Sequence, residues 1–179
     1  MVKLRVTLAL AAMVAVAGLP AAANAAAKPM PMSMQAITIG PITAGAYRLT
    51  LVIAPMQHMY TQAQYNSTHP MSGEIMMGGS MMMGGMGMTM PNRHIELHVM
   101  DRAMRVVTNA MVSISYQPMV GMGKMAIRPQ QLPVATMIEI GKGMASFHYG
   151  NNVYLAPRST YQIAVHVNNA HALFTVRLG

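Results

Sequence analysis

The chain contains no cysteine and no tryptophan, and only 9% of its 179 residues are charged. The absence of cysteine excludes disulfide bonds, thiolate nucleophiles and a lipid-modified N-terminal cysteine. Only 4 side chains are carboxylates, which leaves little material for a hydrolase that works with paired acids. The chain also lacks a Gly-x-Ser-x-Gly elbow, a phosphate-binding loop and a His-Glu-x-x-His motif. We therefore expect that the protein is not an enzyme.

Positive charge is in excess but is not gathered into a patch. The 12 lysine and arginine residues outweigh the 4 acidic residues and give a formal net charge of +8 at pH 7. These basic residues are spread singly along the chain, whereas a nucleic-acid surface usually clusters them among aromatic side chains. We expect no nucleic-acid partner, and any attraction to an anionic membrane surface would be unspecific.

The N-terminus is typical of a secretory signal peptide. Lys3 and Arg5 form a basic segment, residues 6–19 are apolar, and residues 23–25 (ANA) provide a small-x-small cleavage pattern. The apolar run is shorter than the roughly 20 residues that the alternative, an uncleaved membrane anchor, would need. We predict that residues 1–25 are a cleaved signal peptide and that the mature protein is periplasmic or secreted.

Alternation of apolar and polar side chains predicts strands in most of the remaining chain. A Pro/Met-rich linker and first strand region is expected at 26–46, followed by a β-domain at 47–179. We find no convincing amphipathic helix in the mature chain. The pattern predicts an all-β, immunoglobulin-like β-sandwich of about 7–8 antiparallel strands, with a closed barrel as the alternative. The strand segments before the last pair are 47–53, 94–100, 111–116, 137–140 and 145–149.

The C-terminal residues give the clearest strand pair. Asn168 and Asn169 tolerate the positive φ of a two-residue hairpin turn. The same register would put His166 directly opposite His171 on the face away from the core, with Cβ atoms about 5 Å apart. Such a cross-strand pair can hold a metal ion, although two solvated histidines are the alternative. The apolar pairs that this register predicts are Val167 with Ala170, Val165 with Ala172, and Ile163 with Phe174.

Methionine is the strongest anomaly, because the chain contains 24 of them. Residues 71–90 are dominated by methionine and glycine, which predicts a flexible loop inserted in the β-domain. Thioether sulfur is a soft ligand that suits Cu(I), and the glycines would let several sulfurs converge on one ion. Adaptable filling of an apolar core is the alternative role of methionine. The candidate copper ligands of this loop are Met81, Met82, Met83, Met86 and Met88.

A second candidate site is the alternating sequence HIELH at 94–98. His94, Glu96 and His98 would project from one face of a strand, about 6.5–7 Å apart along the chain. With a ligand from another strand they could bind one divalent ion, whereas a solvated polar face is the alternative. His148 precedes a predicted Gly-Asn-Asn turn at 150–152 and is the candidate from another strand.

Three short motifs together resemble the periplasmic iron-transport-associated proteins, a family that includes a treponemal lipoprotein and accessory proteins of high-affinity iron permeases. The motifs are HIE at 94–96, VSISY at 112–116 and HYGNNV at 148–153, and the resemblance covers about residues 47–178. It implies an immunoglobulin-like sandwich, often a homodimer, that binds copper and iron at one site. The ligands implied by the resemblance are His94, Glu96, His148 and an upstream methionine, either Met137 or Met144.

Two departures from this family favour copper over iron. The family tends to carry an acid where this chain has His98, and the long Met/Gly loop is foreign to the family pattern. We therefore predict an exported protein that binds copper and buffers or delivers it, with a membrane permease or exporter as its partner. The alternatives are an accessory protein of periplasmic ferrous-iron uptake and a β-sandwich interaction module that binds no metal.

Overall fold

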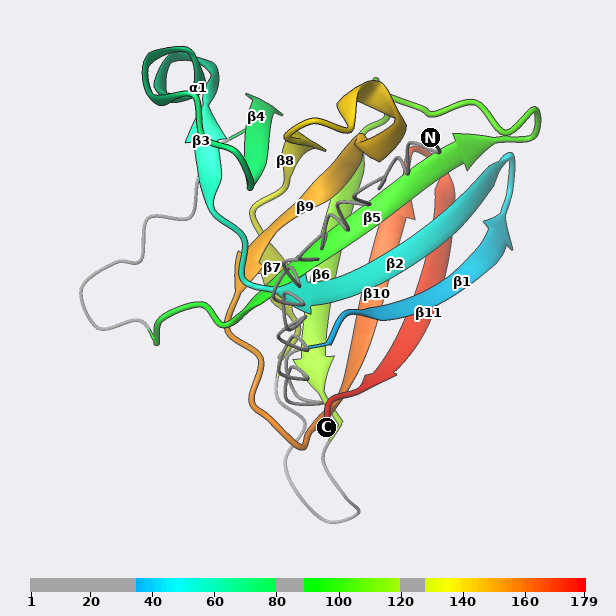
Figure 1. Ribbon diagram of the computed structural model, residues 1–179. Helices are drawn as coiled ribbons and strands as arrows, with labels where there is room; N and C mark the ends of the chain where they lie inside the picture. The colour runs from blue at the N-terminus through cyan, green and yellow to red at the C-terminus, as the bar shows by residue number, and fades with distance from the viewer. Residues whose placement is uncertain (1–34, 80–88, 120–127) are drawn as a thin grey trace, which may run out of the picture.

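The computed structural model describes residues 35–79, 89–119 and 128–179. Two mainly antiparallel sheets form a sandwich-like all-β fold, which confirms the predicted fold class (Figure 1). The described residues form 11 strands, more than the alternation predicted. The strands are β1 Ile37–Ala44, β2 Tyr47–Pro55, β3 Met59–Thr61, β4 Glu74–Gly78, β5 Arg93–Asp101, β6 Val112–Pro118, β7 Gln130–Leu132, β8 Ala135–Glu139, β9 His148–Val153, β10 Thr160–Val167 and β11 Ala170–Arg177.

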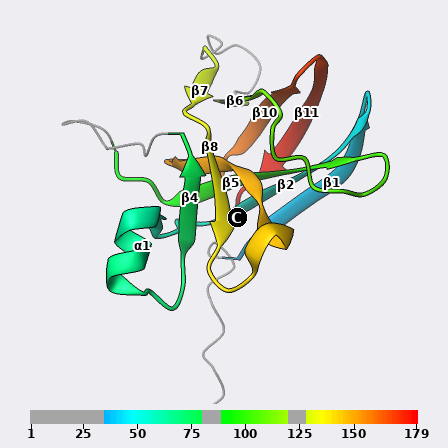
Figure 2. The same ribbon diagram turned by 90° about the horizontal axis from the view of Figure 1, so that it is seen from above.

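Strong twisting of the larger sheet is the feature that positions the candidate site. This sheet has the strand order β1-β2-β5-β9-β8-β4-β3, and the smaller sheet has the order β11-β10-β6-β7. Hydrogen-bonded neighbours are antiparallel except for β3 and β4, which are parallel. Figure 2 shows β4 and β8 running across the direction of β2 and β5. The sheet therefore twists strongly between its β2 side and its β4 side.

The core lies between the two sheets and takes alternate residues of the central strands. Ile95, Leu97 and Val99 of β5 are buried in it, packed with alternate residues of β2 and β10. Because successive side chains of a strand point to opposite faces, His94, Glu96 and His98 project from the outer face of the larger sheet. The β2 and β10 residues in this core are Leu49, Leu51, Ile53, Ile163, Val165 and Val167.

The C-terminal hairpin has the predicted register. β10 and β11 pair Val167 with Ala170 and continue without a break to Thr160 and Arg177. Asn168 takes a positive φ of 51°, as the first central residue of a primed turn requires. The pair of His166 and His171 is also confirmed as directly opposed.

The prediction of one flexible loop at 71–90 is wrong for its first part. Residues 74–78 form β4, which pairs with β8 in the larger sheet, one strand in from the β3 edge. Glu74 and Ile75 are buried there. Glycine and methionine do not indicate a strand, so the composition of residues 74–78 did not predict this short element. The five predicted copper ligands between Met81 and Met88 lie outside the described residues.

The predictions around His148 need two corrections. The segment 145–149 is not one strand, because a 3-10 helix, η2 (Gly143–Ser146), precedes β9. Residues 150–152 are not a turn but continue β9 through its pairing with β5. Gly150 is required because its backbone lies so close to the Ile95 carbonyl that no Cβ would fit. The side chain of Asn151 is also used structurally, since its amide donates to the Pro133 carbonyl oxygen at 2.7 Å.

A short helix, α1 (Gln62–Thr68), was not predicted. It begins with a capping box in which Thr61 and Gln64 exchange side-chain and backbone hydrogen bonds. None of its residues is buried, so it has no apolar stripe for the sequence pattern to reveal. In the part of the chain that the structure describes, no helix has the length and hydrophobicity needed to cross a membrane.

Candidate metal centre

Strand register gathers several polar side chains on the outer face of the larger sheet. His94 of β5 pairs with Asn152 of β9, and Met137 of β8 pairs with His148 of β9. Glu74 of β4 pairs with Glu139 of β8. Directly paired residues share a face. Two strands separate β4 from β5, so only the strong twist can bring Glu74 to His94.

The closest group consists of Glu74, His94 and His148, here called the inner cluster. Its side chains are 3%, 0% and 2% exposed, so the cluster is cut off from solvent. The Nε2 atoms of the two histidines are 3.4 Å apart. Glu74 Oε2 lies 3.2 Å from His94 Nε2, and Oε1 lies 3.6 Å from His148 Nε2. These three side chains can hold a metal ion.

Hydrogen bonds on the far side of each ring fix which nitrogen faces the cluster. Asn152 exchanges two bonds with the Gln57 backbone, accepting at Oδ1 and donating from Nδ2, so its orientation is determined. His94 Nδ1 must therefore donate to Asn152 Oδ1, at 3.0 Å. His148 Nδ1 likewise donates to the Ser146 carbonyl oxygen at 2.8 Å. In the neutral form, both rings thus present an Nε2 lone pair to the cluster.

Three electron-rich groups that face one another in a dry site need a cation between them. Lone pairs and a carboxylate repel when no proton or metal ion lies among them, and burial strengthens this repulsion. Glu74 Oε2 is buried without a hydrogen bond from any described residue. Histidines whose outer nitrogen donates to a carbonyl oxygen, with the inner nitrogen free, are typical of metal sites. The geometry is therefore compatible with a metal site, and a proton can meet the same electrostatic need when no metal ion is bound.

The proton in the metal-free inner cluster belongs on His148. Burial is the main reason that the pKa of His94 lies below its ordinary value; Glu74 opposes this shift and His148 reinforces it. Burial also acts to lower the pKa of His148, but the Glu74 carboxylate and the Ser146 carbonyl more than offset it and raise the pKa. In the metal-free cluster a proton is therefore favoured on His148, next to Glu74, over His94, and a bound metal ion would displace that proton.

A second group, the outer cluster, shares His148 with the first. Glu96, His98 and His148 each offer a ligand atom, and these atoms lie within 4.8 Å of one another. His98 Nε2 is 3.4 Å from Glu96 Oε2. Burial tends to raise the pKa of Glu96, but the His98 contact and the nearby charges of His148 and His94 lower it overall. Glu96 is therefore a carboxylate over the whole neutral range.

A cavity of about 340 Å³ connects the outer cluster to the surface. Its wall includes Glu96, His98 and His148, and its rim carries Glu139 and Lys142. Lys142 Nζ is 2.7 Å from Glu139 Oε2, and both side chains are largely exposed. An ion from solvent would thus meet the outer cluster before it reached the inner one.

The structure brings together the predicted residues from β5 and β9. The rings of His94 and His98 both contact the His148 ring, and Glu96 offers a ligand atom close to those of His98 and His148. The four predicted residues therefore form one group on this face. Met137 is fully buried and shares the face of His148, its direct partner. Met144 lies on η2 and is half exposed.

Glu74 is the ligand candidate that the sequence did not reveal. It sits in a Met/Gly-rich stretch that looks like a loop, and it lies 20 positions before His94. The sequence nevertheless contained a signal for Glu74, because it is one of only 4 acids in the chain. It also stands next to an isoleucine, a strand-forming residue. Its contact with His94 depends on sheet twist, which no local pattern encodes.

The opposite pKa shifts predict opposite pH dependences of stability in the metal-free protein. His148, with its pKa raised, contributes stability that is complete below the unfolded value of 6.5 and is lost as pH rises through the folded pKa. His94, with its pKa lowered, contributes stability that is present above 6.5 and is lost as pH falls toward the folded pKa. Urea unfolding in the presence of a chelator measures the free energy of unfolding of each protein. The difference between wild type and His148→Asn should shrink as pH rises, and the difference between wild type and His94→Asn should shrink as pH falls. Slopes of the same sign for both variants would contradict the assignment of the proton to His148.

Comparisons of the chain with protein-family models, with curated proteins and with solved structures found no match. The resemblance to iron-transport-associated proteins therefore remains a prediction from three short motifs.

Proposed function

We propose that this protein is exported and binds copper, which it buffers or delivers without catalysing a reaction. The observation that carries the proposal is the inner cluster, in which the Nε2 atoms of His94 and His148 face the Glu74 carboxylate in a buried site. Both rings are fixed by acceptors on their far sides, so the ligand atoms are already oriented. A preorganised site of this kind loses little entropy when the ion enters.

Copper is favoured by the softness of the donors around the cluster. Imidazole suits both copper oxidation states, and thioether sulfur suits Cu(I). Among the described residues, Met137 is buried, is paired with His148 and projects from the same face, so it is a candidate thioether ligand for the ion. The chain also offers many more methionines, including those between Met81 and Met88, which we propose as a weaker collector of Cu(I). Methionine forms no disulfide, which suits a copper ligand in an oxidising compartment.

Ferrous iron is the second candidate, and the ligand count favours it. Two histidines and one carboxylate are the protein ligands of many non-haem Fe(II) sites. Glu96 adds a second carboxylate close to the shared His148 ring. In that case the protein would serve an iron permease, as the resemblance implies, and a copper exporter or oxidase would not be its partner.

Competition titrations of the mature protein separate these functions. We expect stoichiometric Cu(I) binding against a chromophoric chelator, and weaker binding of Fe(II) under anaerobic conditions. A variant that lacks residues 80–88 should keep the tight site and lose only weak additional Cu(I) equivalents, because the deletion spares β4 and all four residues of the two clusters on β5 and β9. The deletion variant is thus the matched test of the collector.

The outcomes distinguish the three classes of function. Preference for Fe(II) over Cu(I) would replace copper handling by iron uptake. Loss of the tight site on deletion of 80–88 would place that site in the Met/Gly segment and remove the inner cluster from the proposal. Failure to bind either ion would leave the β-sandwich interaction module.

A further inference from the structure

A second pair of histidines lies on the opposite sheet of the sandwich, far from both clusters in the fold. His166 of β10 and His171 of β11 are directly opposed across the C-terminal hairpin. Their ring centroids are 6.2 Å apart and the ring planes differ by 35°. Both side chains are exposed, and neither makes a hydrogen bond or ion pair with the described residues. Both rings are therefore free to bind something from solvent.

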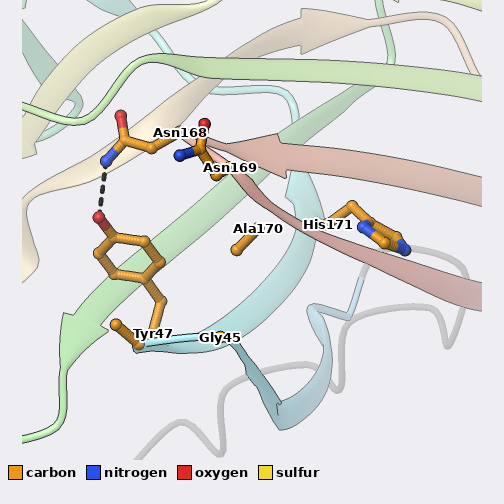
Figure 3. A pocket seen from close by; sticks show the side chains of 7 residues that line it. Gly45, Tyr47, Asn168, Asn169, Ala170 and His171 are labelled. Atoms are coloured by element: carbon orange, nitrogen blue, oxygen red, sulfur yellow. Dashed lines mark hydrogen bonds between the residues drawn. The ribbon is translucent and has the colours of Figure 1, made fainter.

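The backbone that carries this pair is held firmly. Asn168 exchanges two hydrogen bonds with Met111, one through its backbone N–H and one through its side-chain oxygen, both at 2.9 Å. Its side-chain amide also donates to the Tyr47 hydroxyl at 2.6 Å, as Figure 3 shows. β10 is paired on its other side with β6, where His166 faces Ser113. The distance between the two histidine backbones is thus fixed before any ligand binds.

Charge around the pair does not oppose a cation. Side chains that share the outer face of β10 and β11 with the histidines are apolar or neutral up to Arg177. Arg177 is six residues beyond His171, which corresponds to about 20 Å along the strand. On this face of the hairpin, the described residues of β10 and β11 therefore place no positive charge beside the pair.

We propose that His166 and His171 together bind one divalent first-row transition-metal ion, with Cu²⁺ bound most tightly. A metal–nitrogen bond of about 2.0 Å puts the ion roughly 3 Å from each ring centroid. Rings with centroids 6.2 Å apart can therefore share one ion once side-chain rotation turns a nitrogen of each ring toward it. Imidazole is a ligand of borderline softness, and affinities for such sites generally peak at Cu²⁺. This site needs no thioether and no carboxylate, so it is independent of the proposed function.

Two protein ligands leave the remaining coordination positions of the ion open. A surface cavity of about 460 Å³ adjoins the hairpin, and His171 lines it together with Gly45, Tyr47 and Asn169 (Figure 3). This space accommodates water molecules as the further ligands. An ion held in this way would exchange readily with solvent, unlike an ion in the inner cluster.

NMR spectra during addition of Cu²⁺, continued past the equivalent that the inner cluster would take up, test the pair, because the paramagnetic ion broadens only resonances near it. We expect broadening around residues 166 and 171 in wild type, and a dissociation constant raised at least about tenfold by either His166→Asn or His171→Asn. His69→Asn is the matched control, because His69 is another exposed histidine and asparagine tolerates its left-handed φ of 46°. The control should leave the broadening at the hairpin unchanged.

The same spectra keep this site apart from the inner cluster. Glu74→Gln should alter broadening near residues 94 and 148 only, so failure of the proposed function would leave the hairpin signal intact. Wild-type spectra without hairpin broadening would overturn the proposal. So would equal affinities in wild type and in both single variants, because the two rings would then not act together.

Discussion

Glu74→Gln should weaken metal binding about 100-fold or more while the protein stays folded. The substitution keeps the shape of the side chain but removes the charged oxygen that faces both Nε2 atoms of the inner cluster. An amide offers the ion a neutral and weaker donor. The substitution also removes the negative charge that favours a proton on His148, so the pKa of His148 should fall. Competition titration for the metal and NMR titration of the histidine report these two effects separately.

Glu139→Gln is the control for this prediction. Glu139 pairs directly with Glu74 across β4 and β8 and shares its face. The Glu139 side chain is 45% exposed and contacts Lys142 at the cavity rim, so it is solvated and is not part of the inner cluster. Its substitution should change metal affinity by less than about threefold, as for a screened surface charge. Equal losses in the two variants would show that the face acts through its total charge and not through Glu74 as a ligand.

Gly150→Ala should destabilise the protein by about 3 kcal/mol or more, a large part of the stability of a typical domain. A Cβ at this position would overlap the Ile95 carbonyl oxygen and lie 2.9 Å from the carbonyl carbon. It would also lie 3.3 Å from Glu96 Cα. All three atoms are backbone, so β5 and β9 would have to separate, and the ligands of both clusters would separate with them. Urea unfolding followed by circular dichroism measures the loss.

Gly78→Ala provides the comparison for this stability measurement. Gly78 lies on β4 of the same sheet, and a Cβ there would lie 3.1 Å from the Thr136 hydroxyl oxygen. A side-chain atom can move aside, so the expected loss is below about 1 kcal/mol. Similar losses for the two glycines would mean that the close approach of β5 and β9 is not what makes Gly150 necessary.

The parts of the fold that could be predicted are those that depend on local alternation. The HIELH strand and the C-terminal hairpin each have an apolar face that matches the core, and the two asparagines fix the hairpin turn. His94, Glu96 and His98 could be grouped because they alternate along one strand, and His148 was added to them as a candidate from another strand. Local chemistry was sufficient in these cases.

The parts that failed depend on contacts between distant segments. Gly150 indicates a turn when read alone, yet it serves the close packing of β9 on β5. β4 is concealed by glycine and methionine, and its place in the sheet is set by β8 and β3. Glu74 reaches His94 only because the sheet twists across two intervening strands. Composition describes such a segment as a loop, whereas its burial is decided by its neighbours.

The position of β4 near the edge of the larger sheet has a kinetic consequence. The strand carries one ligand, whereas the two imidazoles are held by β5 and β9 in the sheet interior. Its outer neighbour β3 has only three residues, so this edge is expected to open more often than the centre. If the inner cluster binds an ion as proposed, each opening would withdraw the carboxylate and leave that ion on two nitrogens. The residence time of the ion would then be governed by local opening of β4, and the ion could leave the buried site while the sandwich stays folded.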